Sequence, residues 1–147
     1  WHWWLTVVPE IAGHQPPTCG CGTSATEQGL KVHKEVGNLI DWYNIQYYGL
    51  QDYDNCNSLL YKSSSNWPGT SLREIAQKGI PQQMLVIGKP ATQADASKGY
   101  MAPDLLAICV QQAKGKGWSG GVMVWQYPNA DAKWIKAVRA KSWPVKS

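Results

Sequence analysis

The chain has 147 residues, of which 44% are hydrophobic and 16% charged, and it carries a formal net charge of +4. This length fits one compact domain or part of one, and the hydrophobic content excludes a disordered chain. No apolar run approaches the roughly 20 residues of a membrane-spanning helix, and the lysines are scattered, so neither a membrane span nor a nucleic-acid-binding stripe is predicted.

Four short apolar segments alternate with segments of helical pattern along the chain. The predicted strands are residues 3–8, 39–48, 84–87 and 121–126. The helical segments that follow them are residues 27–36, a turn at 59–60, and residues 71–79, 103–115 and 131–139. Ser71 and Glu74 have the spacing of a capping box, which starts a helix. Apolar strands that alternate with amphipathic helices predict an α/β fold with a parallel sheet.

Four cysteines stand at positions 19, 21, 56 and 109, and their spacing is not that of a zinc site. Loop cysteines far apart in sequence favour a disulfide and an oxidising compartment. We predict a bond between Cys56 and either Cys19 or Cys21. Cys109 lies among apolar residues of a predicted helix, which is typical of a small buried thiol.

The periodicity fits either an open flavodoxin-like sheet or half of a (β/α) barrel. In both, ligands bind where the carboxyl ends of the strands meet. The polar and aromatic residues at these ends are Glu10, Gln46, Tyr48, Trp125 and Tyr127. A Trp ring packs against a pyranose and a Tyr hydroxyl donates to a carbonyl, although either ring could instead belong to the core. Gln46 lies two residues before Tyr48, hence on the same strand face. No metal site or cofactor is predicted.

The nine Trp and seven Tyr, with no Phe, suit sugar stacking as well as a core. The chain begins Trp1-His2-Trp3-Trp4, without an initiating Met or a signal-peptide pattern. We therefore expect a processed chain or a fragment of a longer one.

Four segments share residues, in order, with one known family. They are residues 5–10 (LTVVPE), 39–48 (LIDWYNIQYY), 88–91 (GKPA) together with 99–103 (GYMAP), and 120–125 (GGVMVW). These segments resemble the fifth, sixth, seventh and eighth strands of the family 18 glycoside hydrolases, of the class III (hevamine-like) and fungal chitinase type. Each match is weak alone, but together they span most of the chain.

The family fold is a TIM (β/α)8 barrel, which typically takes about 250 residues. The resemblance therefore implies that residues 1–147 form the carboxyl-terminal half of such a barrel, about four β/α units that correspond to strands 5–8. The family signature DxxDxDxE, whose Glu is the general acid, does not occur in this sequence. The resemblance thus implies that the catalytic Glu lies outside this chain, in an amino-terminal half-barrel that acts as its partner.

Hydrolysis in this family is assisted by the substrate, an exception to the scheme with two protein carboxylates. By resemblance, catalytic Tyr48 donates to the substrate acetamide, and Trp125 forms the floor under the sugar. Gln46 contacts the substrate or a catalytic carboxylate, and we add Glu10 and Tyr127 as substrate-binding residues. The class III pattern has Asn where this chain has Gly49. Those enzymes also have a disulfide after the fifth and sixth strands, which supports the predicted pairing of Cys56.

The implied function is hydrolysis of β-1,4 bonds in chitin or other N-acetylglucosamine oligosaccharides by a secreted, fungal-type glycosidase. Two alternatives within the family remain: an endo-β-N-acetylglucosaminidase acting on N-glycans, and a chitinase-like lectin that binds carbohydrate without hydrolysis. A flavodoxin-like nucleotide binder would need a phosphate-binding loop after its first strand. Residues 9–13 (PEIAG) do not have the pattern of such a loop.

Overall fold

The computed structural model describes residues 4–7, 25–49 and 52–144. Its strands form one sheet in chain order, with all three neighbouring pairs parallel. They are β1 (Trp4–Val7), β2 (Trp42–Gln46), β3 (Leu85–Pro90) and β4 (Val122–Trp125). The four predicted parallel strands are thus confirmed. β3 runs three residues beyond its predicted end, through a lysine and a proline.

The predicted helical segments are helices in the structure, and the helix predicted over residues 103–115 has the same ends, while the others are shifted at one or both ends. They are α1 (Ala25–Val36), α2 (Cys56–Leu60), α3 (Leu72–Gln77), α4 (Pro103–Gly115) and α5 (Ala132–Arg139), with 3₁₀ turns at Gly37–Leu39, Gln82–Met84 and Gln93–Asp95. The predicted capping box of Ser71 and Glu74 is present at the start of α3, where the Ser71 N–H donates to the Glu74 carboxylate at 3.1 Å. At the start of α5, the Asp131 side chain accepts from the Trp134 N–H at 2.8 Å. Local capping chemistry therefore places these helix starts.

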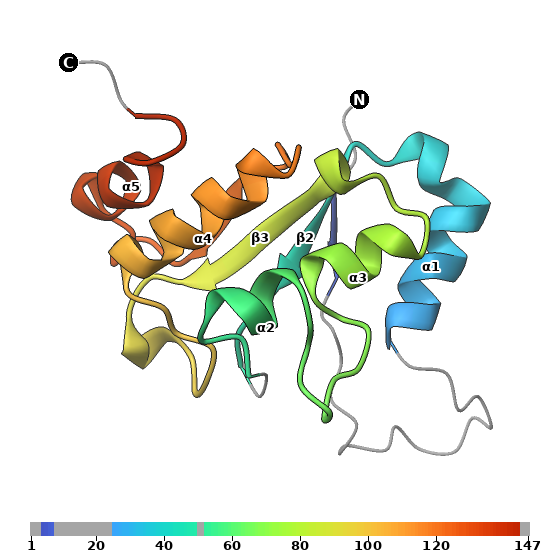
Figure 1. The fold of residues 1–147 in the computed structure, drawn as a ribbon, viewed down its shortest axis with the longest axis horizontal. Helices are drawn as coiled ribbons and strands as arrows, with labels where there is room; N and C mark the ends of the chain where they lie inside the picture. Colours follow the sequence, from blue (N-terminus) through green and yellow to red (C-terminus); the bar gives the residue numbers. More distant parts are fainter. Residues whose placement is uncertain (1–3, 8–24, 50–51, 145–147) are drawn as a thin grey trace.

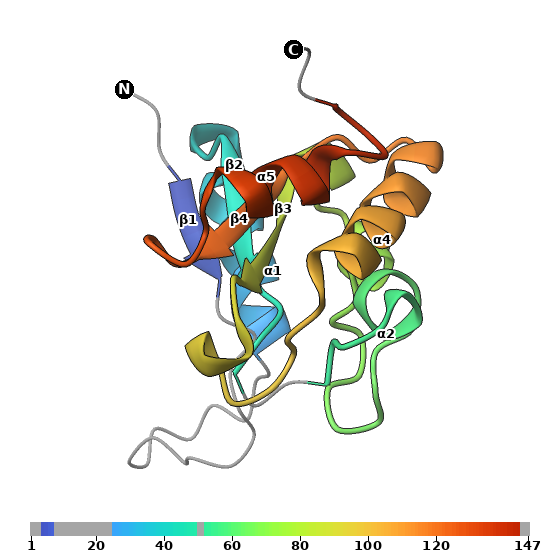
Figure 2. The same cartoon turned by 90° about the vertical axis from the view of Figure 1, so that its left-hand side faces the viewer.

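The helices cover one face of the sheet. In Figure 1, α1 and α5 lie at opposite ends of the molecule, with α2, α3 and α4 between them. Figure 2 shows the strands on one side and α2 and α4 on the other. The core between these layers contains alternate strand residues that are almost fully buried, namely Tyr43, Ile45, Leu85 and Ile87.

The opposite sheet face is less covered. Asn44, Gln46 and Met123 are only partly buried there, and Trp125 is exposed. Val86 is buried on this face but does not join the core on the helix side. A parallel sheet with helices on one face and a partly open second face is the arrangement of a segment of a (β/α) barrel.

The disulfide differs from the predicted one. Cys56, at the start of α2, is bonded to Cys109 of α4, and their Cα atoms are 5.1 Å apart. The predicted bond from Cys56 to Cys19 or Cys21 is therefore wrong, and so is the free thiol at Cys109, although its burial was predicted. The physical reason is that α2 packs directly against α4. Cys19 and Cys21 lie outside the described residues.

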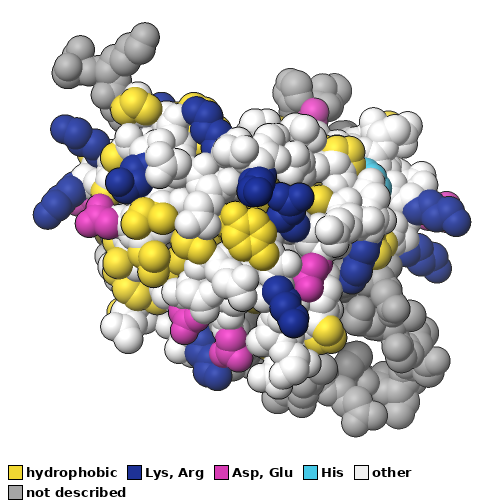
Figure 3. Space-filling model, viewed as in Figure 1, with side chains coloured by type: hydrophobic (Ala, Val, Ile, Leu, Met, Phe, Trp, Pro, Cys, Tyr) yellow, Lys and Arg dark blue, Asp and Glu magenta, His cyan; other side chains and the backbone are white. Residues whose placement is uncertain are grey.

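Basic side chains are spread over the face in Figure 3, among acidic and hydrophobic ones. Within the described ranges, no helix has both the length and the apolar character needed to cross a membrane.

Candidate functional site

The carboxyl ends of β2, β3 and β4 lie at one edge of the sheet. Gln46 pairs with Gly88, and Gly88 pairs with Met123, so these residues occupy one row across the sheet. Two residues further along, Pro90 pairs with Trp125 where β3 and β4 end. Since paired residues of parallel strands point to the same face, Gln46 and Trp125 share the face that the helices leave open.

Tyr48 extends the same face of β2. The Tyr47 N–H still bonds to the Gly88 carbonyl at 3.0 Å, so the chain continues alongside β3 past the end of β2. Strand alternation then carries Tyr48 to the face of Gln46. Tyr48 is partly buried, and this burial raises the pKa of its phenol. The hydroxyl therefore keeps its proton at neutral and acidic pH and can donate a hydrogen bond.

Tyr48 and Trp125 flank β3. Because β3 separates β2 from β4, their backbones are two strand spacings apart, about 10 Å. Gly88 lies in the row between these strands, where a Cβ would be 2.6 Å from the Ile45 carbonyl oxygen and 2.9 Å from the Met123 methyl carbon. Only glycine fits at this position without a shift of its neighbours.

Trp125 ends β4 and is 47% exposed, and Tyr127 is 87% exposed. The Trp125–Gln126 and Tyr127–Pro128 peptide bonds are cis. The Trp125 carbonyl accepts from the Ala91 N–H at 2.5 Å, which ties the end of β4 to the end of β3. A half-exposed indole offers a flat apolar surface that a sugar ring can cover. Glu10, the remaining predicted site residue, lies outside the described residues.

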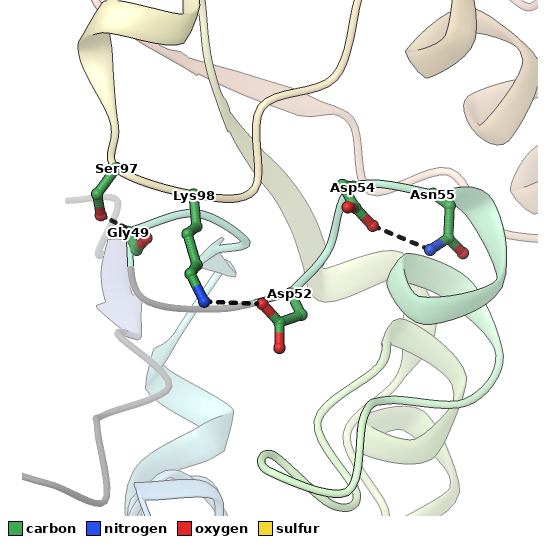
Figure 4. A network of polar contacts seen from close by, with 6 residues as sticks. All are labelled: Gly49, Asp52, Asp54, Asn55, Ser97 and Lys98. Carbon is green, nitrogen blue, oxygen red and sulfur yellow. Dashed lines mark hydrogen bonds and ion pairs between the residues drawn. The ribbon is translucent and has the colours of Figure 1, made fainter.

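Polar contacts at the rim join the loop after β2 to the loop after β3, as Figure 4 shows. The Ser97 hydroxyl donates to the Gly49 carbonyl at 2.7 Å, and the Lys98 ammonium lies 3.5 Å from the Asp52 carboxylate. Gly49 has a φ of +94°, a region that favours glycine. A hollow of about 300 Å³ opens between these loops, and its lining includes Asp54, Gln93 and Tyr100.

A fully buried lysine lies beneath this rim. The Lys89 side chain is 0% exposed, and its ammonium donates to the carbonyls of Tyr47 at 3.0 Å, Gly99 at 2.8 Å and Tyr53. Burial lowers the pKa of Lys89 from 10.5 to about 7, and the Asp54 carboxylate acts in the opposite direction. Lys89 lies in the segment 88–91 that resembles the seventh strand of the family, but no role was predicted for it. The available signal was a charge directly after an apolar strand, at a position that the sheet buries.

The buried lysine predicts a pH dependence of stability. Because the folded pKa of Lys89 is about 7 and the unfolded one about 10.5, the unfolded chain binds more protons above pH 7. Burial of the charge therefore costs stability below pH 7, and that stability returns as the pH rises. Between pH 6 and pH 8 we expect the free energy of unfolding to rise by about 1 kcal/mol more in the wild-type protein than in Lys89→Met. Urea denaturation at both values measures this, and equal changes in the two proteins would contradict it.

The part of the chain that the structure describes contains no group of three or more His, Cys, Asp or Glu side chains that could hold a metal ion.

No model of a protein family matches this chain, and a search of curated proteins finds no match. Solved structures do match it. A GH18 chitinase from Pseudoalteromonas aurantia is 26% identical with a TM-score of 0.63, over 80% of this chain and 41% of that one. A fungal endo-β-N-acetylglucosaminidase from glycosyl hydrolase family 18 is 24% identical with a TM-score of 0.51, over 84% and 39%. A class V chitinase from Nicotiana tobaccum in complex with NAG4 is 16% identical with a TM-score of 0.52, over 97% and 56%.

The resemblance to family 18 glycosidases that the sequence indicated is thus confirmed by structural similarity. The two matches of lower identity support the fold alone. The Pseudoalteromonas chitinase shares the fold and has the higher sequence identity of 26%. The chain spans between 39% and 56% of the length of these structures, as a partial barrel does. A fungal origin stays a prediction.

Proposed function

We propose that this chain is the carboxyl-terminal part, strands 5–8, of a chitinase-type glycosidase barrel of family 18, and that it holds the N-acetylglucosamine unit at the bond to be cleaved. The observation that carries the proposal is the open sheet face on which Gln46 and Trp125 lie, with Tyr48 two residues past the end of β2. The identity to a GH18 chitinase over 80% of the chain supports it.

The proposed chemistry uses the substrate acetamide as the nucleophile. Its carbonyl oxygen attacks the anomeric carbon while an acid protonates the leaving oxygen, so positive charge develops on the sugar. Tyr48 donates a hydrogen bond to the acetamide and orients it for attack. Trp125 packs under the sugar ring, and the Gln46 amide bonds to the substrate or to a catalytic carboxylate. Glu10 and Tyr127 complete the predicted substrate-binding set.

The general acid comes, in this proposal, from residues outside this chain. The sequence has no DxxDxDxE motif, and the half-exposed Trp125 lies on a face that the described helices do not cover. The partner is therefore an amino-terminal half-barrel that closes the sheet over this face. The Cys56–Cys109 disulfide supports a secreted protein, because such bonds persist in oxidising compartments.

The test is hydrolysis of the N-acetylglucosamine tetramer by the intact protein that carries this chain, with products identified by mass spectrometry. We expect cleavage, and we expect Tyr48→Phe to lower kcat by about tenfold or more, because donors to a reacting oxygen are typically worth that much. Tyr61→Phe is the matched control, because Tyr61 is also partly buried but packs against the core.

Two other outcomes would replace the proposal. Binding of the tetramer without cleavage would make the protein a chitinase-like lectin. Cleavage of an N-glycan core but not of the tetramer would make it an endo-β-N-acetylglucosaminidase.

A further inference from the structure

The peptide groups on both sides of Tyr48 are held by one segment, residues 88–98. Tyr47 and Gly49 each use both the backbone N–H and the carbonyl in hydrogen bonds to that segment. The partners are the Gly88 carbonyl and the Lys89 ammonium for Tyr47, both at 3.0 Å, and the Lys98 carbonyl at 3.0 Å and the Ser97 hydroxyl at 2.7 Å for Gly49. The backbone that carries Tyr48 is therefore fixed by β3 and the loop after it.

Lys89 is the buried member of this set. Its three ammonium hydrogens bond to carbonyls of three separate places: the end of β2, the loop before α2, and the loop before α4. The buried Tyr47 and Tyr53 rings also pack edge to face, with centroids 4.8 Å apart, so the first two of these places meet inside the core as well. One side chain thus links the strand end that precedes Tyr48 to both rim loops of Figure 4.

Stability does not account for a lysine here. A buried ammonium loses its hydration, and apolar residues of similar volume are often as stabilising as buried charged groups or more so. Methionine is unbranched and of nearly the same length, and would fill the space without that cost. What methionine cannot do is donate three hydrogen bonds in fixed directions.

We propose that Lys89 is a positioning residue for Tyr48: its ammonium, together with the rim bonds of Ser97 and Lys98, holds the Tyr48 backbone so that the phenol meets the substrate acetamide. The inference rests on the proposed function, because it takes Tyr48 as the donor to substrate. A displacement of about 1 Å at a reacting group can lower the rate by as much as 100-fold. A Tyr48 side chain that is not held in place would therefore contribute little to the orientation of the acetamide.

The direct test is ¹⁹F NMR of the intact protein labelled with 3-fluorotyrosine, with the Tyr48 resonance assigned by its loss in Tyr48→Phe. We expect one sharp Tyr48 resonance in the wild-type protein, and a shifted or broadened one in Lys89→Met. The resonance of Tyr61, on the helix side, serves as the internal reference. Lys78→Met is the matched control, because Lys78 also donates to a backbone carbonyl, that of Gly69 at 3.0 Å, but is exposed. An unchanged Tyr48 resonance in Lys89→Met would overturn the proposal.

The second test is a double-mutant cycle on tetramer hydrolysis at pH 5, where Lys89 is protonated. Lys89→Met should lower kcat by about tenfold with KM little changed, and it should have almost no effect in a Tyr48→Phe background. Equal losses in both backgrounds would mean a general structural role and would overturn the proposal. If Lys89→Met does not fold, both tests are repeated with Ser97→Ala, which removes the exposed hydroxyl that bonds to the Gly49 carbonyl. We expect this variant to lower kcat by about threefold, and the same outcomes would support or overturn the proposal.

The two proposals fail differently. A wild-type protein that does not hydrolyse the tetramer refutes the proposed function, while the NMR comparison still reports whether Lys89 positions Tyr48.

Discussion

Trp125→Ala in the intact protein should lower kcat/KM on N-acetylglucosamine oligosaccharides by well over tenfold. A tenfold loss corresponds to about 1.4 kcal/mol of transition-state stabilisation. Trp125 is 47% exposed at the carboxyl end of β4, so its open surface is available to a sugar ring. Alanine removes that surface and leaves the apolar side of the sugar in water.

Trp42→Ala is the matched control for this change. Trp42 is 36% exposed and begins β2, so it has the same ring and a similar exposure at the opposite end of the sheet. We expect its kcat/KM to change by less than threefold, and thermal unfolding of both variants separates stability from activity. Near-normal turnover of Trp125→Ala, or an equal loss in both variants, would reject the role of Trp125 as the sugar floor.

Loss of the Cys56–Cys109 disulfide should lower the free energy of unfolding by about 4 kcal/mol. The bond joins residues 53 positions apart, so it closes a long loop and removes much conformational entropy from the unfolded chain. It also ties α2 to α4 inside the core, where Cys109 is fully buried. Urea denaturation of a Cys56→Ala/Cys109→Ala double variant measures the loss.

The comparison variant is Cys19→Ser/Cys21→Ser, which leaves the Cys56–Cys109 bond intact and should change stability much less. A digest without reduction should release a peptide pair joined through Cys56 and Cys109. A peptide that joins Cys56 to either of the other two cysteines would contradict the pairing in the structure.

The strands and helices could be predicted from the sequence because their signals are local. An apolar run such as residues 84–87 marks a strand buried on both faces. Asp131 starts α5 because its side chain accepts from the Trp134 N–H, and Ser71 starts α3 because its N–H and its hydroxyl donate to the Glu74 carboxylate. The positions of Gln46, Tyr48 and Trp125 at one edge followed from the rule that parallel strands end together.

Two features could not be predicted because they depend on which elements touch. The burial of Cys109 followed from its helix face, but its partner depends on the packing of α2 against α4, which no local pattern encodes. No role for Lys89 followed from the sequence, because lysines are mostly exposed in folded proteins. In the structure its ammonium is enclosed by three carbonyls from segments 10 to 42 residues away.

The sequence by itself therefore determined the order and type of the elements, the parallel sheet, and the strand ends that carry the candidate sugar-binding side chains, since periodicity and capping act over a few residues. Only the tertiary structure decided the cysteine pairing, the spacing of Tyr48 and Trp125 across β3, and the buried lysine that joins the rim loops. These depend on strand register and helix packing, in which residues distant in the chain become neighbours.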